Sequence, residues 1–257
     1  MLICFANLLT YLELDNMSVG TISLSLSNRT EPIVGLEDVN RWLITIGAHV
    51  HQIEIPHEMI QLLDSSHSRA LNEEECSKLI QQFTLDRVEW LAMIRRCGRD
   101  PVLPEGGYLS TSEVGVPPYP KVYDMMAMSH DQHIAAEQKF GRLHVNKSAD
   151  TGVDELMALV AGGPWTWFFG FPDKSVGKLS MSRINFLDQA ISLGWGVAYT
   201  GANPHGAFMN AKDGLVVASI CGPELWSMCY EAPEHPLNDL LGNNPWVDFS
   251  SDVPRLL

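Results

Sequence analysis

The sequence predicts an α+β fold, with a helical N-terminal half and a C-terminal half of mostly antiparallel strands with packed helices. In the first half, apolar residues recur three and four positions apart, which is the spacing of one helix face. In the second half, short apolar and aromatic runs alternate with glycine and proline turns, which is typical of strands joined by short connections.

The first expected helix covers residues 36–46, where apolar side chains share one helical face and Gly47 follows the end. His49 to Ile55 then alternates as a strand does, so that His49, His51, Ile53 and Ile55 share one face. Pro56 is expected to open a second helix, because its missing N–H is harmless in the first turn.

Two further helices are expected before residue 97. Asn72 and Glu75 stand three residues apart in a capping-box pattern, which marks the start of the third helix. The fourth helix is expected to be capped by Thr84 and to end at Arg96, where cationic residues are followed by a glycine.

Residues 98–122 break this pattern with five prolines and four glycines, which exclude a helix or a central strand there. We therefore expect a helical subdomain over residues 1–97, a Pro/Gly-rich connection over 98–122 and an α+β subdomain over 123–257.

The second half is expected to alternate between strands and helices. The expected strands cover residues 142–146, 165–171, 177–183, 195–200 and 215–220. Helices are expected over residues 130–140, capped by Ser129, over 150–161, capped by Asp150, over 186–193, and from Pro223 onward. The chain after Ala232 is expected to wrap the surface.

Composition narrows the function classes. The 257 residues hold 17 Lys and Arg against 31 Asp and Glu, a formal net charge of −14, and 46% are hydrophobic. These values are those of a globular chain. Phosphate affinity needs clustered cations, so we expect no nucleic-acid partner.

Cysteines and the N-terminus indicate a cytoplasmic protein. The five cysteines include no CxxC pair, so we expect reduced thiols. The apolar run within residues 1–16 lacks the cationic start of a signal peptide and is too short to span a bilayer. Met17 is an alternative start, and no membrane association is expected.

Common cofactor and hydrolase motifs are absent from the sequence. It contains no P-loop, no G-x-G-x-x-G after a strand, no G-x-S-x-G elbow and no H-E-x-x-H. Function therefore has to be sought in less regular groups of histidine, acid and aromatic residues.

Two short histidine patterns have metal-ligating residue types. His49 and His51 project from one strand face, but Glu54 projects from the other, so a pair of structural histidines is the favoured interpretation. His130, His133 and Glu137 form one stripe of the expected helix and supply two imidazoles and a carboxylate, a donor set for zinc or ferrous iron. A solvated helix face is the alternative.

A dispersed set in the second half supplies the predicted catalytic residues His144, Glu155 and His205. His144 projects opposite Leu143 and Val145, and His205 lies in a long connection. The aromatic residues expected to line a small-molecule or cofactor pocket beside them are Trp165, Trp167 and Tyr199. An apolar core is the alternative role for these rings.

The stretch from Gly141 to Gly162 partly resembles the first cupin motif, a histidine-rich strand followed by Glu, six residues and Gly. Glu155 has that spacing from Gly162. Asn146 stands where the motif has its second histidine, and it lies too far from Glu155. The second motif is absent apart from His205 and Asn210, and the expected helix contradicts the resemblance. We assign no family from it.

Two functions of different classes are compatible with these patterns. The first is an enzyme acting on a small molecule, with one divalent metal ion or with a histidine as general base. The second is a non-enzymatic interaction protein, such as an inhibitor, an immunity-type partner or an assembly subunit, whose acidic surface fits a basic protein partner. The sequence determines neither the oligomeric state nor the substrate.

Overall fold

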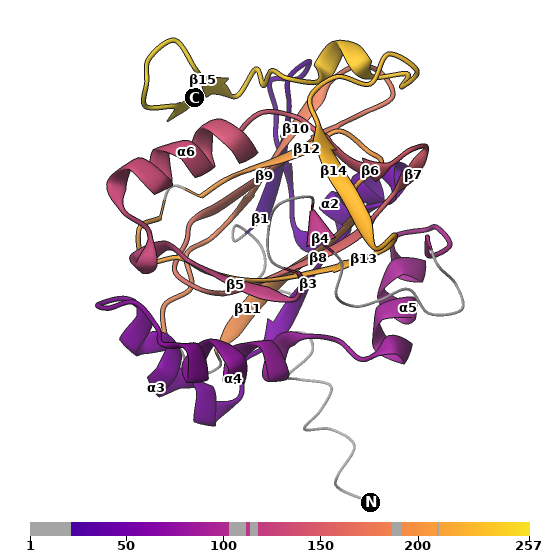
Figure 1. The fold of residues 1–257 in the computed structure, drawn as a ribbon. Helices are drawn as coiled ribbons and strands as arrows, with labels where there is room; N and C mark the ends of the chain where they lie inside the picture. The colour runs from indigo at the N-terminus through magenta and orange to yellow at the C-terminus, as the bar shows by residue number, and fades with distance from the viewer. Residues whose placement is uncertain (1–21, 103–111, 114–117, 187–191, 210) are drawn as a thin grey trace, which may run out of the picture.

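The computed structural model describes residues 22–102, 112–113, 118–186, 192–209 and 211–257 and has a mixed α+β fold. Two five-stranded sheets enclose the main apolar core, and helices pack around them (Figure 1). The core contains Leu24 and Phe169 from one sheet and Met157 and Val197 from the other.

The first sheet is antiparallel throughout. Its strands, in spatial order, are β12 (His205–Phe208), β9 (Trp165–Gly170), β10 (Val176–Met181), β1 (Ile22–Leu26) and β2 (Ile33–Val34). Strand β1 pairs with β10 across more than 150 residues, because both present buried apolar side chains to the same core.

The second sheet is also antiparallel throughout. Its strands, in spatial order, are β3 (His49–Glu54), β11 (Leu193–Thr200), β8 (Asp154–Ala161), β13 (Leu215–Cys221) and β5 (Lys121–Asp124). Strand β8 is central, and all its residues are buried. A third sheet contains β4 (Ser112–Glu113), β14 (Leu225–Cys229), β6 (Val145–Ser148) and β7 (Thr151–Gly152). A fourth sheet pairs β15 (Val247–Asp248) with β16 (Arg255–Leu256).

The helices lie outside the sheets (Figure 1). They are α2 (Leu36–Leu43), α3 (His57–Ser66), α4 (Glu73–Phe83), α5 (Arg87–Arg96) and α6 (His130–Phe140), with 3₁₀ turns η1 (Ile44–Ile46), η2 (Met125–Ala127) and η3 (Asn238–Leu240). Helix α5 packs on the outer face of the second sheet, and α6 lies beside β12. The expected capping box of α4 is confirmed at Asn72–Glu75, and Ser129 caps α6 as expected, in a capping box with Gln132.

Several predicted elements are wrong. Residues 150–161 form β7 and β8 instead of a helix, because a fully buried apolar run carries no alternation that separates strand from helix. The helix expected from Pro223 is the strand β14. Asp86, and not Thr84, caps α5, since its carboxylate accepts a hydrogen bond from Glu89 N.

The N-terminal half is not purely helical, because β1, β2 and β3 belong to the two large sheets. Strands from both sides of residues 98–122 share each sheet, and the predicted division into subdomains stays a prediction. Residues 1–16, Met17, Cys4, and residues 187–191 of the helix expected over 186–193 lie outside the described residues.

Cysteine and membrane predictions can be compared with the described part of the chain. Cys76, Cys97, Cys221 and Cys229 are all free thiols. Among the described residues, no helix combines the length and the apolar character needed to cross a bilayer.

A buried ion pair joins the segment after α5 to the central strand. The Arg99 guanidinium pairs with the Asp154 carboxylate, which is 1% exposed and also accepts a hydrogen bond from Val102 N at 2.8 Å. Arg99 Nε donates to Gly47 O, so the pair connects three separate segments.

We predict that Asp154→Ala lowers the free energy of unfolding by about 3–5 kcal/mol, because it leaves the Arg99 guanidinium, which is only 17% exposed, without its counter-charge. Urea denaturation measures this change. Asp239→Ala, which breaks the exposed Lys174–Asp239 pair, is the control and should unfold close to wild type. Equal effects of the two substitutions would contradict the prediction.

Candidate functional site

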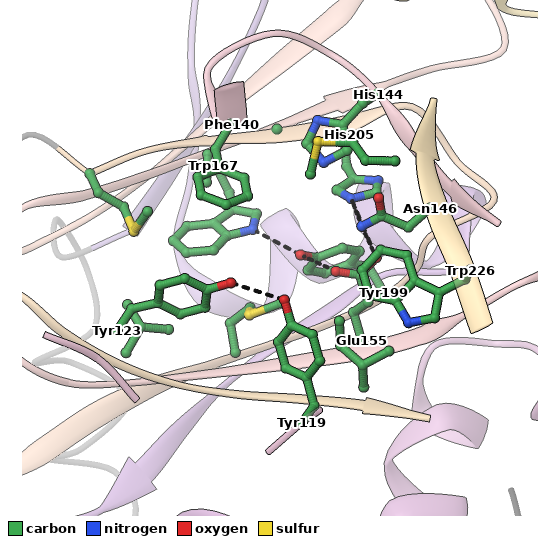
Figure 2. Close-up of a pocket in the computed structure, with 17 residues that line it drawn as sticks. Tyr119, Tyr123, Phe140, His144, Asn146, Glu155, Trp167, Tyr199, His205 and Trp226 are labelled. Carbon is green, nitrogen blue, oxygen red and sulfur yellow. Dashed lines mark hydrogen bonds and ion pairs between the residues drawn. The ribbon is translucent and has the colours of Figure 1, made fainter. Parts of the chain in front are cut away.

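A cavity of about 50 Å³ lies between the inner faces of the two large sheets (Figure 2). Its polar lining consists mainly of His144, Asn146, Glu155, His205 and Tyr199, and aromatic rings complete the wall. The structure therefore brings together the three residues predicted as catalytic, although they lie on separate segments of the chain.

A single backbone bridge aligns the two histidines. His144 N donates to His205 O, and His205 N donates to His144 O, both at 2.9 Å. Residues directly opposite in an antiparallel pair project to the same side, so the two rings lie in contact with centroids 4.4 Å apart. Leu143 and Val145 point into apolar clusters on the other side, as the alternation predicts.

Both imidazoles are held in the same tautomer. His144 Nδ1 lies 2.8 Å from Arg142 O, and His205 Nδ1 lies 2.8 Å from Asn203 O. A carbonyl oxygen can only accept a hydrogen bond, so each neutral ring carries its proton on Nδ1. The lone pair then resides on Nε2, which is the arrangement of a histidine prepared to bind a metal ion or accept a proton.

Glu155 faces these rings from the central strand of the second sheet. Its cross-strand neighbour on β11 is Tyr199, whose hydroxyl donates to Glu155 Oε2 at 3.1 Å. Trp167 Nε1 in turn donates to the Tyr199 hydroxyl at 3.5 Å. The other carboxylate oxygen, Oε1, lies 3.4 Å from His205 Nε2 (Figure 2). These contacts hold the carboxylate beside the imidazole.

Asn146 completes the polar group. Its Nδ2 donates to Glu155 Oε1 at 2.9 Å and lies 3.3 Å from His205 Nε2. Because Glu155 Oε1 and His205 Nε2 are both acceptors, the nitrogen of the amide faces them and the oxygen points elsewhere. The amide oxygen, Oδ1, is buried and has no hydrogen-bond partner among the described residues. A buried oxygen without a hydrogen-bond partner is unfavourable in free energy. A bound ligand that supplied the missing partner would remove this cost.

Burial changes the ionisation of this group. Desolvation raises the pKa of Glu155 and raises that of Tyr199 well above its usual value. Burial, with His205 as the next cause, holds the pKa of His144 well below its usual value. His144 is therefore a neutral base at physiological pH.

The three aromatic residues predicted to line the pocket lie in two different places. Trp167 and Tyr199 line the cavity, whereas Trp165 is fully buried in the core with its ring against Gly214. The sequence reasoning missed Asn146 and the aromatic residues Tyr119, Tyr123 and Trp226, which also line the cavity. The signal for Asn146 was its position two residues after His144, on the same strand face.

The α6 stripe lies at a different site. His133 Nε2 is 3.3 Å from Glu137 Oε1, and both residues line a groove of about 710 Å³ between α6 and the C-terminal segment. His130 lines the same groove. Burial raises the pKa of Glu137 to about 7.

The strand histidines His49 and His51 are remote from the cavity, on the β3 face opposite the core residue Val50. Their ring centroids are 6.2 Å apart, and burial lowers the pKa of both, that of His51 to about 4. In the described part of the chain, no three His, Cys, Asp or Glu side chains are already placed to hold a metal ion.

Residues 154–161 form a strand, so the helix that contradicted the partial cupin resemblance is not present. The departures at Asn146 and in the spacing before Glu155 remain. Asn210 lies outside the described residues.

Comparisons with known proteins assign no family. No family model matches the chain, and no curated protein matches it. Among solved structures, it is similar to "Acireductone dioxygenase from Bacillus anthracis with cadmium ion in active center", with a TM-score of 0.49 and 11% identity. The match covers 79% of this chain and 94% of that chain. A likeness at this level carries no conclusion about activity or metal.

We predict that Glu137→Gln flattens the pH dependence of stability. In the folded protein the pKa of Glu137 is raised to about 7, whereas its ordinary value is 4.5. Between these pH values the unfolded chain loses this proton and the folded protein keeps it, so the free energy of unfolding of wild type falls as pH rises. Glutamine cannot ionise, so the free energy of unfolding of the variant, relative to that of wild type, should rise between pH 4.5 and pH 8. Urea denaturation measures this difference.

Glu58→Gln, at an exposed position in α3, is the matched control and should follow the wild-type curve. A Glu137→Gln curve parallel to wild type across this pH range would contradict the assigned burial of the carboxyl group.

Proposed function

We propose that the cavity is the active site of an enzyme that acts on a small molecule with the help of one divalent metal ion held by His144, Glu155 and His205. The observation that supports this most is that both histidines donate Nδ1–H to a backbone carbonyl, which leaves Nε2 as the basic nitrogen. Metal-ligating histidines usually have such a hydrogen bond on the other ring nitrogen.

The donor set fits a divalent transition metal. Two imidazoles and one carboxylate are the ligands of many ferrous and zinc sites. Asn146 turns its Nδ2 toward Glu155 and His205 and has a buried Oδ1 without a partner among the described residues, so a flip of this amide would offer a fourth, neutral oxygen donor. A metal ion bound there would polarise a substrate oxygen or lower the pKa of a bound water.

The remaining residues position and enclose the reacting groups. Tyr199, itself held by Trp167, orients the Glu155 carboxylate. The walls are largely aromatic and apolar, and such low-polarity surroundings strengthen electrostatic interactions within the cavity. Burial keeps His144 neutral, so that its Nε2 lone pair is available to the metal ion.

The contacts favour this mechanism over a metal-free carboxylate–histidine pair. In such a pair the carboxylate accepts the Nδ1 proton and leaves Nε2 to act on the substrate. Here a backbone carbonyl accepts the Nδ1 proton of His205, and Glu155 lies near Nε2 instead. When Glu155 is ionised, the imidazole and the carboxylate present lone pairs to one another, an arrangement that a shared cation relieves.

We predict that the purified protein binds one divalent metal ion per chain and that His144→Ala with His205→Ala abolishes binding. Elemental analysis gives the stoichiometry. Chelator-treated protein should then unfold at a higher temperature after addition of Zn²⁺, Fe²⁺ or Mn²⁺.

His130→Ala with His133→Ala is the matched control, because it removes the two imidazoles of the α6 stripe instead. This variant should keep its metal. Metal loss in the control alone would move the metal site to α6, and wild-type protein without metal or metal-dependent stabilisation would refute the proposed function.

We predict that Tyr199→Phe weakens metal affinity by about 10- to 100-fold, since it removes the hydrogen bond that orients Glu155. Competition with a metal indicator measures the affinity. Tyr230→Phe keeps the ring that lies against His144 and removes only the hydroxyl that donates to Lys139 O, so it should bind metal as wild type does. Equal affinities of the two variants would contradict a role for Tyr199 in positioning the ligand.

A further inference from the structure

The stretch of chain that leads into His144 is held from both sides. On one side, the backbone of His144 pairs with that of His205. On the other side, Leu143 N donates to Asn243 O at 2.9 Å, and Gly242 N donates to Leu143 O at 2.8 Å. This second neighbour is a C-terminal segment, and none of its described residues lines the cavity.

Two side chains add to this contact. Asn244 is 2% exposed, and its Nδ2 donates at 2.8 Å to Gly141 O, at the end of α6. Its Oδ1 accepts a hydrogen bond at 3.0 Å from the backbone N–H two residues later, so both ends of the amide have a partner and its orientation is defined. Arg142 Nη1 donates to Gly242 O at 3.0 Å. We call residues 242–244 the C-terminal clamp.

Apolar packing joins the same two parts of the chain. The residues before and after His144 point away from the cavity, and both are fully buried. Leu143 packs in one cluster with Val247, and Val145 packs in another with Leu241. Because protein interiors are closely packed, a displacement of the C-terminal clamp would also displace the backbone that carries His144.

The C-terminal clamp also acts on the His144 ring. The carbonyl that accepts the Nδ1 proton of His144 is Arg142 O, at 2.8 Å, and Arg142 lies in the clamped stretch. The His205 ring has the same kind of support from Asn203 O, at 2.8 Å. Among the described residues, Asn203 has no hydrogen bond to the C-terminal clamp. A change in the clamp should therefore affect one imidazole and leave the other as it is.

We infer that Asn244 is a positioning residue for His144. Through Gly141 O it fixes the stretch whose carbonyl keeps the His144 proton on Nδ1 and the lone pair on Nε2. The inference rests on the proposed function in treating that lone pair as a metal ligand. Its first readout, the tautomer of the ring, does not require the metal ion.

The test is NMR of the imidazole nitrogens in ¹⁵N-labelled, chelator-treated protein at pH 7.5. Long-range ¹H–¹⁵N spectra distinguish the nitrogen that carries the proton from the one with the lone pair, and His144→Gln assigns the His144 signals. In wild type, His144 and His205 should each show the Nδ1–H tautomer alone. Asn244→Ala should bring the two ¹⁵N shifts of His144 closer together, because a second tautomer becomes populated, and should leave those of His205 unchanged.

Asn238→Ala is the matched control. This amide lies in the same C-terminal part of the chain, but its Oδ1 accepts a hydrogen bond from Ala232 N, at 2.7 Å. The variant should keep the wild-type shifts of both rings. If Asn244→Ala does not fold, Arg142→Gln should shift the His144 tautomer in the same direction, because it removes the bond from a half-buried side chain to Gly242 O. An unchanged His144 tautomer in the folded variants, or an equal change in Asn238→Ala, would overturn the inference.

Metal titration of the same variants separates this inference from the proposed function. Asn244→Ala should bind Zn²⁺ about 10- to 100-fold more weakly than wild type, the effect of losing an outer hydrogen bond that orients a ligand, and Asn238→Ala should bind it as wild type does. A His144 tautomer that responds to Asn244→Ala in a protein that binds no metal would refute the metal-dependent enzyme and keep the positioning role. Wild-type metal binding with a tautomer and an affinity that Asn244→Ala leaves unchanged would do the reverse.

Discussion

The backbone bridge between His144 and His205 is the interaction on which the site depends. It joins the segment that follows α6 to β12, at the edge of the first sheet. Because opposed residues of an antiparallel pair project to one side, this pairing sets both imidazoles, and Asn146 two residues later, toward the second sheet. Each ring is then fixed by a carbonyl two residues earlier in its own segment. Local and long-range backbone contacts thus act together on the same two side chains.

The second constraint is the burial of ionisable groups between two apolar sheets. Glu155 is 2% exposed, as is His205, in a core otherwise formed by aliphatic and aromatic side chains. Removing these groups from water is unfavourable unless hydrogen bonds replace hydration. Asn146, Tyr199 and Trp167 supply most of that replacement, and Asn146 Oδ1 has no partner among the residues that the structure describes. A core built for stability alone would not contain this polar group, which is why function is sought here.

The two faces of β8 explain why this strand serves both stability and the site. Glu155 and Met157 point inward to the cavity, whereas Leu156 packs outward with Ala198 and Cys221 beneath α5. A strand covered on both faces reads as a continuous apolar run, so its alternation is hidden. This explains the incorrect helix prediction at residues 150–161.

Interactions between residues close in the sequence could be predicted from the sequence. The capping boxes at Asn72 and Ser129 join residues three apart, and the aromatic alternation of residues 165–170 marks a strand without further information. The residue types of His144, Glu155 and His205 were also sufficient to select them as candidates. Tertiary structure alone decided that these three meet, that Asn146 and two tyrosines join them, and that Trp165 does not. The reason is physical: strand pairing between residues such as 144 and 205 depends on the whole core, and no short stretch of sequence specifies its partner.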